Sequence, residues 1–187
     1  MSLILTKGGS ISLTARVPGL ARIVVALGWD PDTDFDLDAS AILLGTNGRV
    51  PSDRFFVFYN NLTSPDGYVR HTGDNRTGAG AGDDEQVHVE LAELPRGIAR
   101  IVFPVSIYAA DQRRQSFGQV RNAYIRVLDP ADDREIVRYD LSTATSTETA
   151  MVFGEIYRSG MDWRFRAVGQ GYASGLVGIA RDFGVRV

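Results

Sequence analysis

The sequence predicts an all-β protein, an antiparallel two-sheet β-sandwich with minor short helices. Apolar and β-branched residues occur in about ten short runs, the length that strands usually have. Turn sequences such as Pro18-Gly19, Asn47-Gly48 and Asp129-Pro130 separate many of these runs. Helical periodicity is weak. Many short strands with frequent turns between them are typical of a sandwich.

The predicted strands follow one another along most of the chain. They cover residues 11–16, 22–27, 37–44, 54–59, 87–91, 100–108, 124–128, 136–139, 150–157 and 163–168. A short C-terminal helix is expected over 175–183, and a helical turn within 111–120. Residues 73–82 contain four glycines and predict an irregular loop, of the kind that often carries function.

Length and composition indicate a cytoplasmic protein of one domain, residues 1–187. A chain of 187 residues can bury a sizeable core. Its formal charge of -3 argues against nucleic-acid binding as a main task. Cysteine is absent, which excludes a disulfide framework and fits a reducing compartment. The first ten residues lack the charged and long apolar regions of a signal peptide, so none is expected, and no apolar run approaches the ~20 residues of a membrane span. We therefore expect no direct membrane insertion.

The densest chemical signal is acidic. Residues 30–38 contain five aspartates and no basic residue. The second half of this stretch alternates acidic and apolar residues, so a strand would place three carboxylates on one face: Asp34, Asp36 and Asp38. Like charges in such a row repel each other, and a bound cation would relieve the repulsion. Oxygen ligands favour a hard cation, Ca²⁺ ahead of Mg²⁺.

Further oxygen donors flank the neighbouring predicted strands. They are Asn60 and Asn61, then Gly73, Asp74 and Asn75, then Asp83, Asp84 and Glu85. Any one group is typical of a solvated turn, but together they favour a metal site. An EF-hand is excluded, because its sixth and twelfth positions would be Ala39 and Gly45. Of the two histidines, His71 is interpreted as a surface loop residue, or else as a support for a metal ligand, and His88 as solvent-facing.

Two other functions stay open at this point. One is a metal-dependent enzyme such as a hydrolase, which would need an open coordination position and a base. The other is a structural protein in which calcium joins the sandwich to its partners.

These motifs resemble the TerD family of tellurium-resistance and stress proteins. The likeness covers nearly the whole chain in order, at residues 28–30, 34–40, 58–61, 71–78, 82–85, 113–120, 146–151 and 165–171. Only residues 31–33 separate the Gly-Trp-Asp motif from the acidic strand, a shorter insert than is usual in the family.

The resemblance implies a β-sandwich that binds two calcium ions close together and is not an enzyme. It implies a bacterial cytoplasmic protein in tellurite or general stress resistance, working with other tellurium-resistance proteins at the inner membrane face. The enzyme alternative then extends to a protein that processes tellurium oxyanions. Direct reduction of such an oxyanion has little support, since the sequence has no cysteine and no flavin or haem signature. Carried onto this chain, the calcium ligands would be Asp34, Asp36, Asp38, Asn60, Asn61, Gly73, Asp74, Asn75, Asp83, Asp84 and Glu85.

Overall fold

A computed structural model describes residues 2–30, 34–73, 82–141 and 147–187. Two β-sheets form a sandwich, which confirms the predicted fold class. The first sheet, sheet A, has six strands in the order β1 (Leu3–Leu5), β11 (Arg134–Asp140), β10 (Tyr124–Asp129), β3 (Ile23–Gly28), β8 (Glu85–Val89) and β7 (Val69–His71). Sheet A is mixed, because β1 pairs with β11 in parallel.

The second sheet, sheet B, has seven strands. Six follow the order β2 (Ser10–Ser12), β13 (Asp162–Tyr172), β12 (Ala150–Ser159), β9 (Arg100–Ile107), β5 (Ala41–Leu44) and β6 (Phe56–Val57). The seventh, β4 (Leu37–Ala39), pairs with the C-terminal half of β9. All pairs in sheet B are antiparallel.

The main core lies between the sheets and follows the two-residue alternation of the strands. Alternate residues of β3 and β9, such as Val25 and Phe103, belong to one apolar cluster. Phe35, Leu37 and Ala39 belong to the same cluster, so the apolar half of the acidic strand faces the core as predicted. A second cluster lies on the outer face of sheet B, under the helix α3 (Gly175–Asp182).

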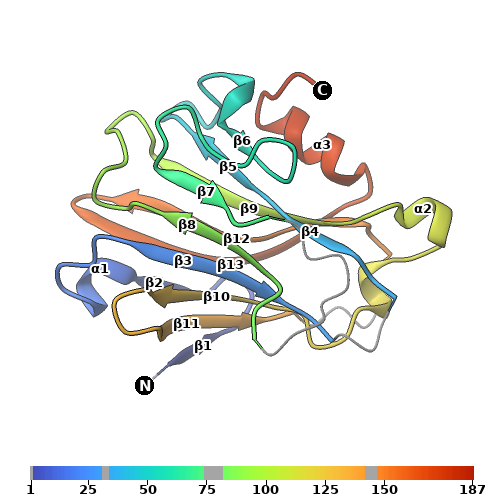
Figure 1. Ribbon diagram of the computed structural model, residues 1–187, viewed down its shortest axis with the longest axis horizontal. Helices are drawn as coiled ribbons and strands as arrows, with labels where there is room; N and C mark the ends of the chain where they lie inside the picture. The colour runs from blue at the N-terminus through green and yellow to red at the C-terminus, as the bar shows by residue number, and fades with distance from the viewer. Residues whose placement is uncertain (1, 31–33, 74–81, 142–146) are drawn as a thin grey trace.

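Short helices complete the chain: α1 (Leu13–Arg16), α2 (Ala110–Arg113), η1 (Asp53–Phe55) and η2 (Phe117–Gln119). The expected helical turn within 111–120 and the C-terminal helix are both present. Figure 1 shows α2 at one end of the molecule's long axis and the turn between β12 and β13 at the other end. Strand β4 pairs with the C-terminal half of β9, and β9 leads into α2. The candidate ligands of the acidic strand therefore lie near the α2 end of the molecule.

Three local predictions were wrong. The strand expected over 11–16 stops at Ser12, whose side chain accepts a hydrogen bond from Ala15 N and so starts α1. The strand expected over 37–44 is split at Ser40, opposite Pro104, which has no N–H to continue the pairing. Of the strand expected over 54–59, only Phe56–Val57 form a strand, which is β6. The short strands β1 and β7 were not predicted.

Candidate metal centre

The acidic strand buries two of its three predicted ligands. Asp36 and Asp38 are 7% and 8% exposed, although they alternate with residues that face the core, whereas Asp34 is exposed. Sheet B holds the strand in place: Tyr108 N donates to the Asp36 carbonyl at 2.8 Å, and Asp38 pairs with Ser106 of β9. Buried carboxylates are costly unless a positive charge or hydrogen-bond donors offset the loss of water.

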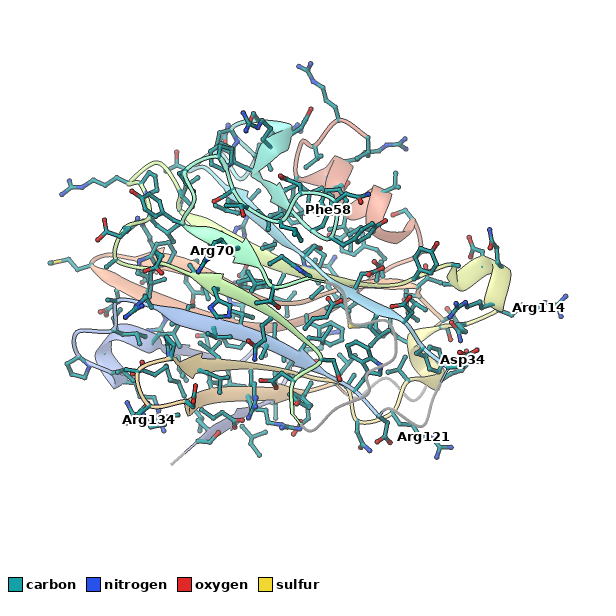
Figure 2. All side chains as sticks on the ribbon, viewed as in Figure 1. Asp34, Phe58, Arg70, Arg114, Arg121 and Arg134 are labelled. Atoms are coloured by element: carbon teal, nitrogen blue, oxygen red, sulfur yellow. The ribbon has the colours of Figure 1, made fainter. Side chains whose placement is uncertain are left out.

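The N-terminal end of the strand is fixed through its backbone. The carbonyl of Asp34 accepts hydrogen bonds from Gln115 Nε2 at 2.7 Å and from Arg113 Nη1 at 3.4 Å. Figure 2 shows Asp34 at the same end of the molecule as Arg114 and Arg121. The segment after β9 therefore positions the acidic strand.

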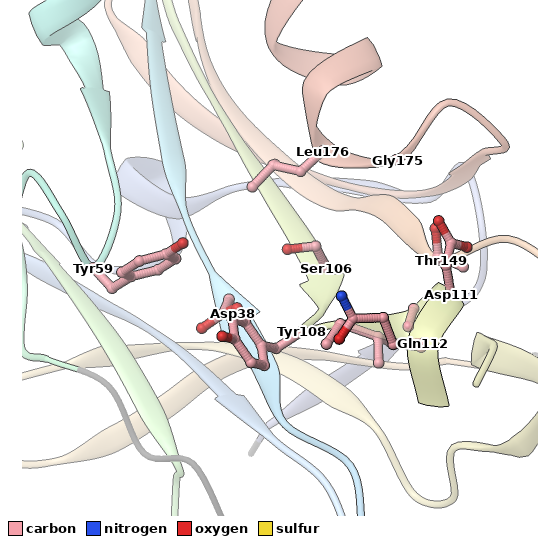
Figure 3. Close-up of a pocket in the computed structure, with 12 residues that line it drawn as sticks. Asp38, Tyr59, Ser106, Tyr108, Asp111, Gln112, Thr149, Gly175 and Leu176 are labelled. Carbon is pink, nitrogen blue, oxygen red and sulfur yellow. The ribbon is translucent and has the colours of Figure 1, made fainter. Parts of the chain in front are cut away.

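A pocket of about 330 Å³ opens beside Asp38. Oxygen-bearing side chains line much of it, namely Asp38, Tyr59, Ser106, Tyr108, Asp111 and Thr149. Figure 3 shows Tyr59 on one side of Asp38 and Gln112 on the other, with Leu176 above. Carboxylate and hydroxyl oxygens in a polar pocket are suitable ligands for a hard cation.

The predicted amide ligands lie in a tight turn next to this pocket. Asn61 N donates to the carbonyl of Phe58, and Phe58 N donates back to Asn61. The Asn61 side chain donates to the carbonyls of Arg54 and Phe56, at 3.0 and 2.7 Å, so its nitrogen holds the turn. Asn60 is exposed in the same turn and follows Tyr59, which lines the pocket.

A second group of site residues is built around Glu85. Its side chain is 1% exposed, and its Oε2 accepts a hydrogen bond from Ala39 N of β4. His71 Nε2 lies 3.4 Å from the same oxygen and 3.0 Å from the Ala39 carbonyl. Glu85 and His71 thus connect two strands of sheet A to the acidic strand of sheet B.

The hydrogen bonds also identify the tautomer of His71. Gly73 N donates to His71 Nδ1 at 3.0 Å, so Nδ1 accepts and the proton is on Nε2. The ring is therefore neutral here and holds the backbone at Gly73, another predicted ligand. The prediction of a surface histidine was wrong, because His71 ends β7 and is only 5% exposed. The alternative role, support of predicted ligands, agrees with these contacts. His88, expected to face solvent, is half-buried.

Asp84 binds the end of β3. Its Oδ2 accepts a hydrogen bond from Trp29 N at 3.0 Å, and Asp84 N donates to the Leu27 carbonyl. Burial raises the pKa of Asp84, the Trp29 hydrogen bond lowers it, and the charge of Asp83 raises it further, so the net direction is upward. Trp29 itself is buried in the core.

Asp83 is held by an arginine. Arg126 Nε and Nη2 donate to its two carboxylate oxygens at 2.8 and 3.0 Å, and Tyr124 Oη donates to Oδ1 at 3.0 Å. The Asp83 side chain is only 3% exposed. Such a bidentate pair occupies most of the lone pairs that a cation would use. The case for calcium is therefore carried by Asp36 and Asp38 rather than by Asp83.

Neutralising either partner of the Asp83–Arg126 pair should destabilise the chelated protein. Asp83→Asn and Arg126→Gln should each cost about 1.5–3 kcal/mol, and a double-mutant cycle should give a coupling above about 1 kcal/mol. Denaturant titration in EDTA measures the loss of stability in each variant and the coupling energy of the pair. The exposed pair Asp132–Arg134 is the matched control and should couple by less than about 0.5 kcal/mol. Equal coupling in the two cycles would contradict a holding role for Arg126.

The donor set described so far fits a calcium ion in chemistry but is incomplete. Among residues 2–30, 34–73, 82–141 and 147–187, no three Asp, Glu or His side chains group closely enough to hold a metal. Asp74 and Asn75, both predicted ligands, lie outside the described residues, as does Asp32. Asp36 and Asp38 supply buried oxygens on one strand. Glu85 contacts Ala39 of that strand, and Asp84 contacts Trp29 just after β3. Gly73 contacts His71, which in turn lies beside Glu85.

Comparison with known proteins assigns the chain to a family. The sequence pattern of the TerD domain matches residues 1–183. The chain belongs to the TerD family. It is 52% identical to the tellurium resistance protein TerD of Serratia marcescens, over 99% of this chain and 98% of that one. It is 46% identical to general stress protein 16U of Bacillus subtilis over the full length of both.

A solved TerD-family structure agrees with the fold. A crystal structure of a homologue of telluride resistance protein TerD from Streptomyces coelicolor superposes with a TM-score of 0.68 at 28% identity, covering 87% of this chain and 96% of that one. Within the residues described for this TerD-family chain, no helix is long and apolar enough to cross a membrane.

Three contacts of the site were not evident in the sequence. The roles of Arg126 and Tyr124 depend on the pairing of β10 with β3, which brings them beside Asp83. The role of His71 depends on β7, a strand of three residues with no clear sequence signal. The position of His71 next to the glycine-rich loop was the one available clue, and it pointed to a supporting role.

Proposed function

We propose that this TerD-family chain is a calcium-binding module that acts in tellurite and general stress resistance by binding and assembly, not by catalysis. The observation that carries the proposal is the burial of Asp36, just before β4, and of Asp38 within β4, beside a pocket that Asp38 and several hydroxyl side chains help to line. A divalent cation there would offset the cost of burying two carboxylates.

Related proteins support the biological part of the proposal. The relative from Serratia marcescens is named for tellurium resistance, and relatives from Bacillus subtilis are named as general stress and stress response proteins. We propose two calcium ions per chain. Their ligands would come from the acidic strand, the 58–61 turn and the segments around 73–75 and 83–85. Other tellurium-resistance proteins at the inner membrane face are the proposed partners.

Calcium binding should depend on the acidic strand. Asp36→Asn and Asp38→Asn should each weaken calcium binding by more than about tenfold, because each removes a charged oxygen from the cage. Titration calorimetry of chelator-treated protein measures the affinity and the number of ions. Mg²⁺ should bind more weakly than Ca²⁺, because it needs a tight octahedron and gives up water reluctantly.

The matched control is Asp132→Asn, an exposed aspartate after the β10 strand. It should bind calcium as the parent does. If Asp36→Asn and Asp38→Asn both bind calcium like the parent, the acidic strand is not the metal site and the proposal fails.

A further inference from the structure

The outer face of sheet B is divided into two halves of different chemistry. On one half, Ile179 and Ala180 of α3 pack against Ile42, Leu44 and Val102 of the sheet. On the other half, which α3 does not cover, the strands present charged residues. The change occurs along the strands: β9 contributes Val102 to the apolar half and Arg100 to the charged half, and β12 contributes Val152 and Glu155 in the same way. Both halves therefore belong to one continuous face.

The strand pairing places the charged residues in two adjacent rows. In the first row, Tyr157 lies directly opposite Arg100 on β9 and opposite Arg164 on β13. In the second row, Glu155 lies opposite Val102 and opposite Arg166. Directly opposite residues point to the same side of a sheet. We call these five residues the arginine face: Arg100, Glu155, Tyr157, Arg164 and Arg166.

Ion pairs and hydrogen bonds hold the arginine face together. Glu155 lies 3.4 Å from Arg100 Nη1 and 3.2 Å from Arg166 Nη1. Arg166 Nη2 also donates to the Tyr157 hydroxyl at 3.3 Å. Arg164 Nη2 donates to the hydroxyl of Ser10 on β2 at 3.3 Å. Burial raises the pKa of Tyr157, but hydrogen bonds from Ser10, Arg164 and Arg166 lower it by more.

The arginine face carries a surplus of positive charge. It has three guanidinium groups and a single carboxylate, and that carboxylate is 8% exposed beneath guanidiniums that are 37% and 45% exposed. The chain as a whole carries a formal charge of -3, so composition alone does not explain a positive patch. The three arginines lie on β9 and β13, on either side of β12, and their surplus positive charge would attract an anionic partner.

We propose that the arginine face docks an acidic surface of a partner protein. Arginine and tyrosine are enriched in protein interfaces and among their energetically dominant residues, as is methionine in their composition. The adjoining turn between β12 and β13 presents Met161, which is fully exposed. The residues of the arginine face lie side by side on one sheet face, and such a face suits a broad protein contact. It lies away from α2 and the acidic strand, so docking there leaves the candidate calcium site accessible (Figure 1).

The test uses a labelled oligo-glutamate peptide, the full chain and fluorescence polarisation in EDTA, so that calcium plays no part. The peptide should bind at low salt and dissociate as salt screens the charges. Arg164→Gln should weaken binding about three- to fivefold, the size of one exposed ion pair. This variant leaves both ion pairs of Glu155 intact, and thermal unfolding checks that it folds. Arg164→Gln combined with Arg166→Gln should weaken binding more than either change alone.

Arg70→Gln is the matched control, since Arg70 is an exposed arginine on β7 of the other sheet. It should bind the oligo-glutamate peptide like the parent. Equal losses for Arg70→Gln and Arg164→Gln would overturn the proposal, because binding would then follow total charge. Binding to phosphatidylglycerol vesicles that depends on Arg164, with no peptide binding, would also overturn it in favour of a membrane surface.

Discussion

Saturating calcium is expected to raise the melting temperature of the chelated protein by about 5–10 °C. If calcium binds only the folded state, a concentration about 100 times the dissociation constant adds about 2.7 kcal/mol of stability for one site. For a domain of this size, each kcal/mol raises the melting temperature by about 2–4 °C. A second ion would add to this shift. Calorimetric or fluorescence melting curves, in EDTA and after calcium is restored, measure the effect.

The physical reason is the concentration of carboxylates in the acidic strand. Asp36 and Asp38 are both buried in the acidic strand, and the repulsion between their carboxylates should destabilise the chelated protein. Asp36→Asn in EDTA should therefore melt at or above the parent, although it should lose most of the calcium-dependent rise. Magnesium at the same concentration should give a smaller rise. Melting curves that respond to neither EDTA nor calcium would contradict a calcium-stabilised fold.

The fold was largely predictable because strand alternation is a local signal. The run 163–168 alternates buried and more exposed residues, whereas 100–108 and 150–157 are largely apolar runs of the length expected for buried strands, and turn residues mark where many runs end. The errors came from contacts between distant parts of the chain. The break at Ser40 depends on Pro104, which is remote in sequence but opposite in the sheet. Strands of three residues, such as β7, are too short to show a period.

The site was predictable in its chemistry but not in its contacts. The acidic strand is evident from its composition, and its apolar half packs into the core as the alternation requires. The segment Asp83, Asp84 and Glu85 appears in the sequence as three equivalent carboxylates. In the structure, each binds a different element: Asp83 binds Arg126, Asp84 binds Trp29, and Glu85 binds Ala39. Only the register of β8 with its neighbours distinguishes them.

Removing the Glu85 side chain should cost about 3–4 kcal/mol of stability, even in EDTA. Its Oε2 accepts the Ala39 N–H and lies 3.4 Å from His71 Nε2, in a site where both side chains are 1% exposed. Glu85→Ala takes the acceptor from a buried N–H and leaves a cavity, and each of these changes is destabilising. Denaturant titration of the chelated protein measures the loss.

Two further variants separate a structural role for Glu85 from a metal-binding one. Glu85→Gln keeps an oxygen that can accept from Ala39 N, so it should cost less than half as much in EDTA as Glu85→Ala. Glu93→Ala, at an exposed position, should change stability by less than about 0.5 kcal/mol. If Glu85→Ala is as stable as the parent in EDTA and differs only when calcium is added, Glu85 acts solely through the metal. A loss in EDTA instead means that Glu85 joins β8 to the acidic strand before any ion binds, so the cage is partly assembled in the folded chain.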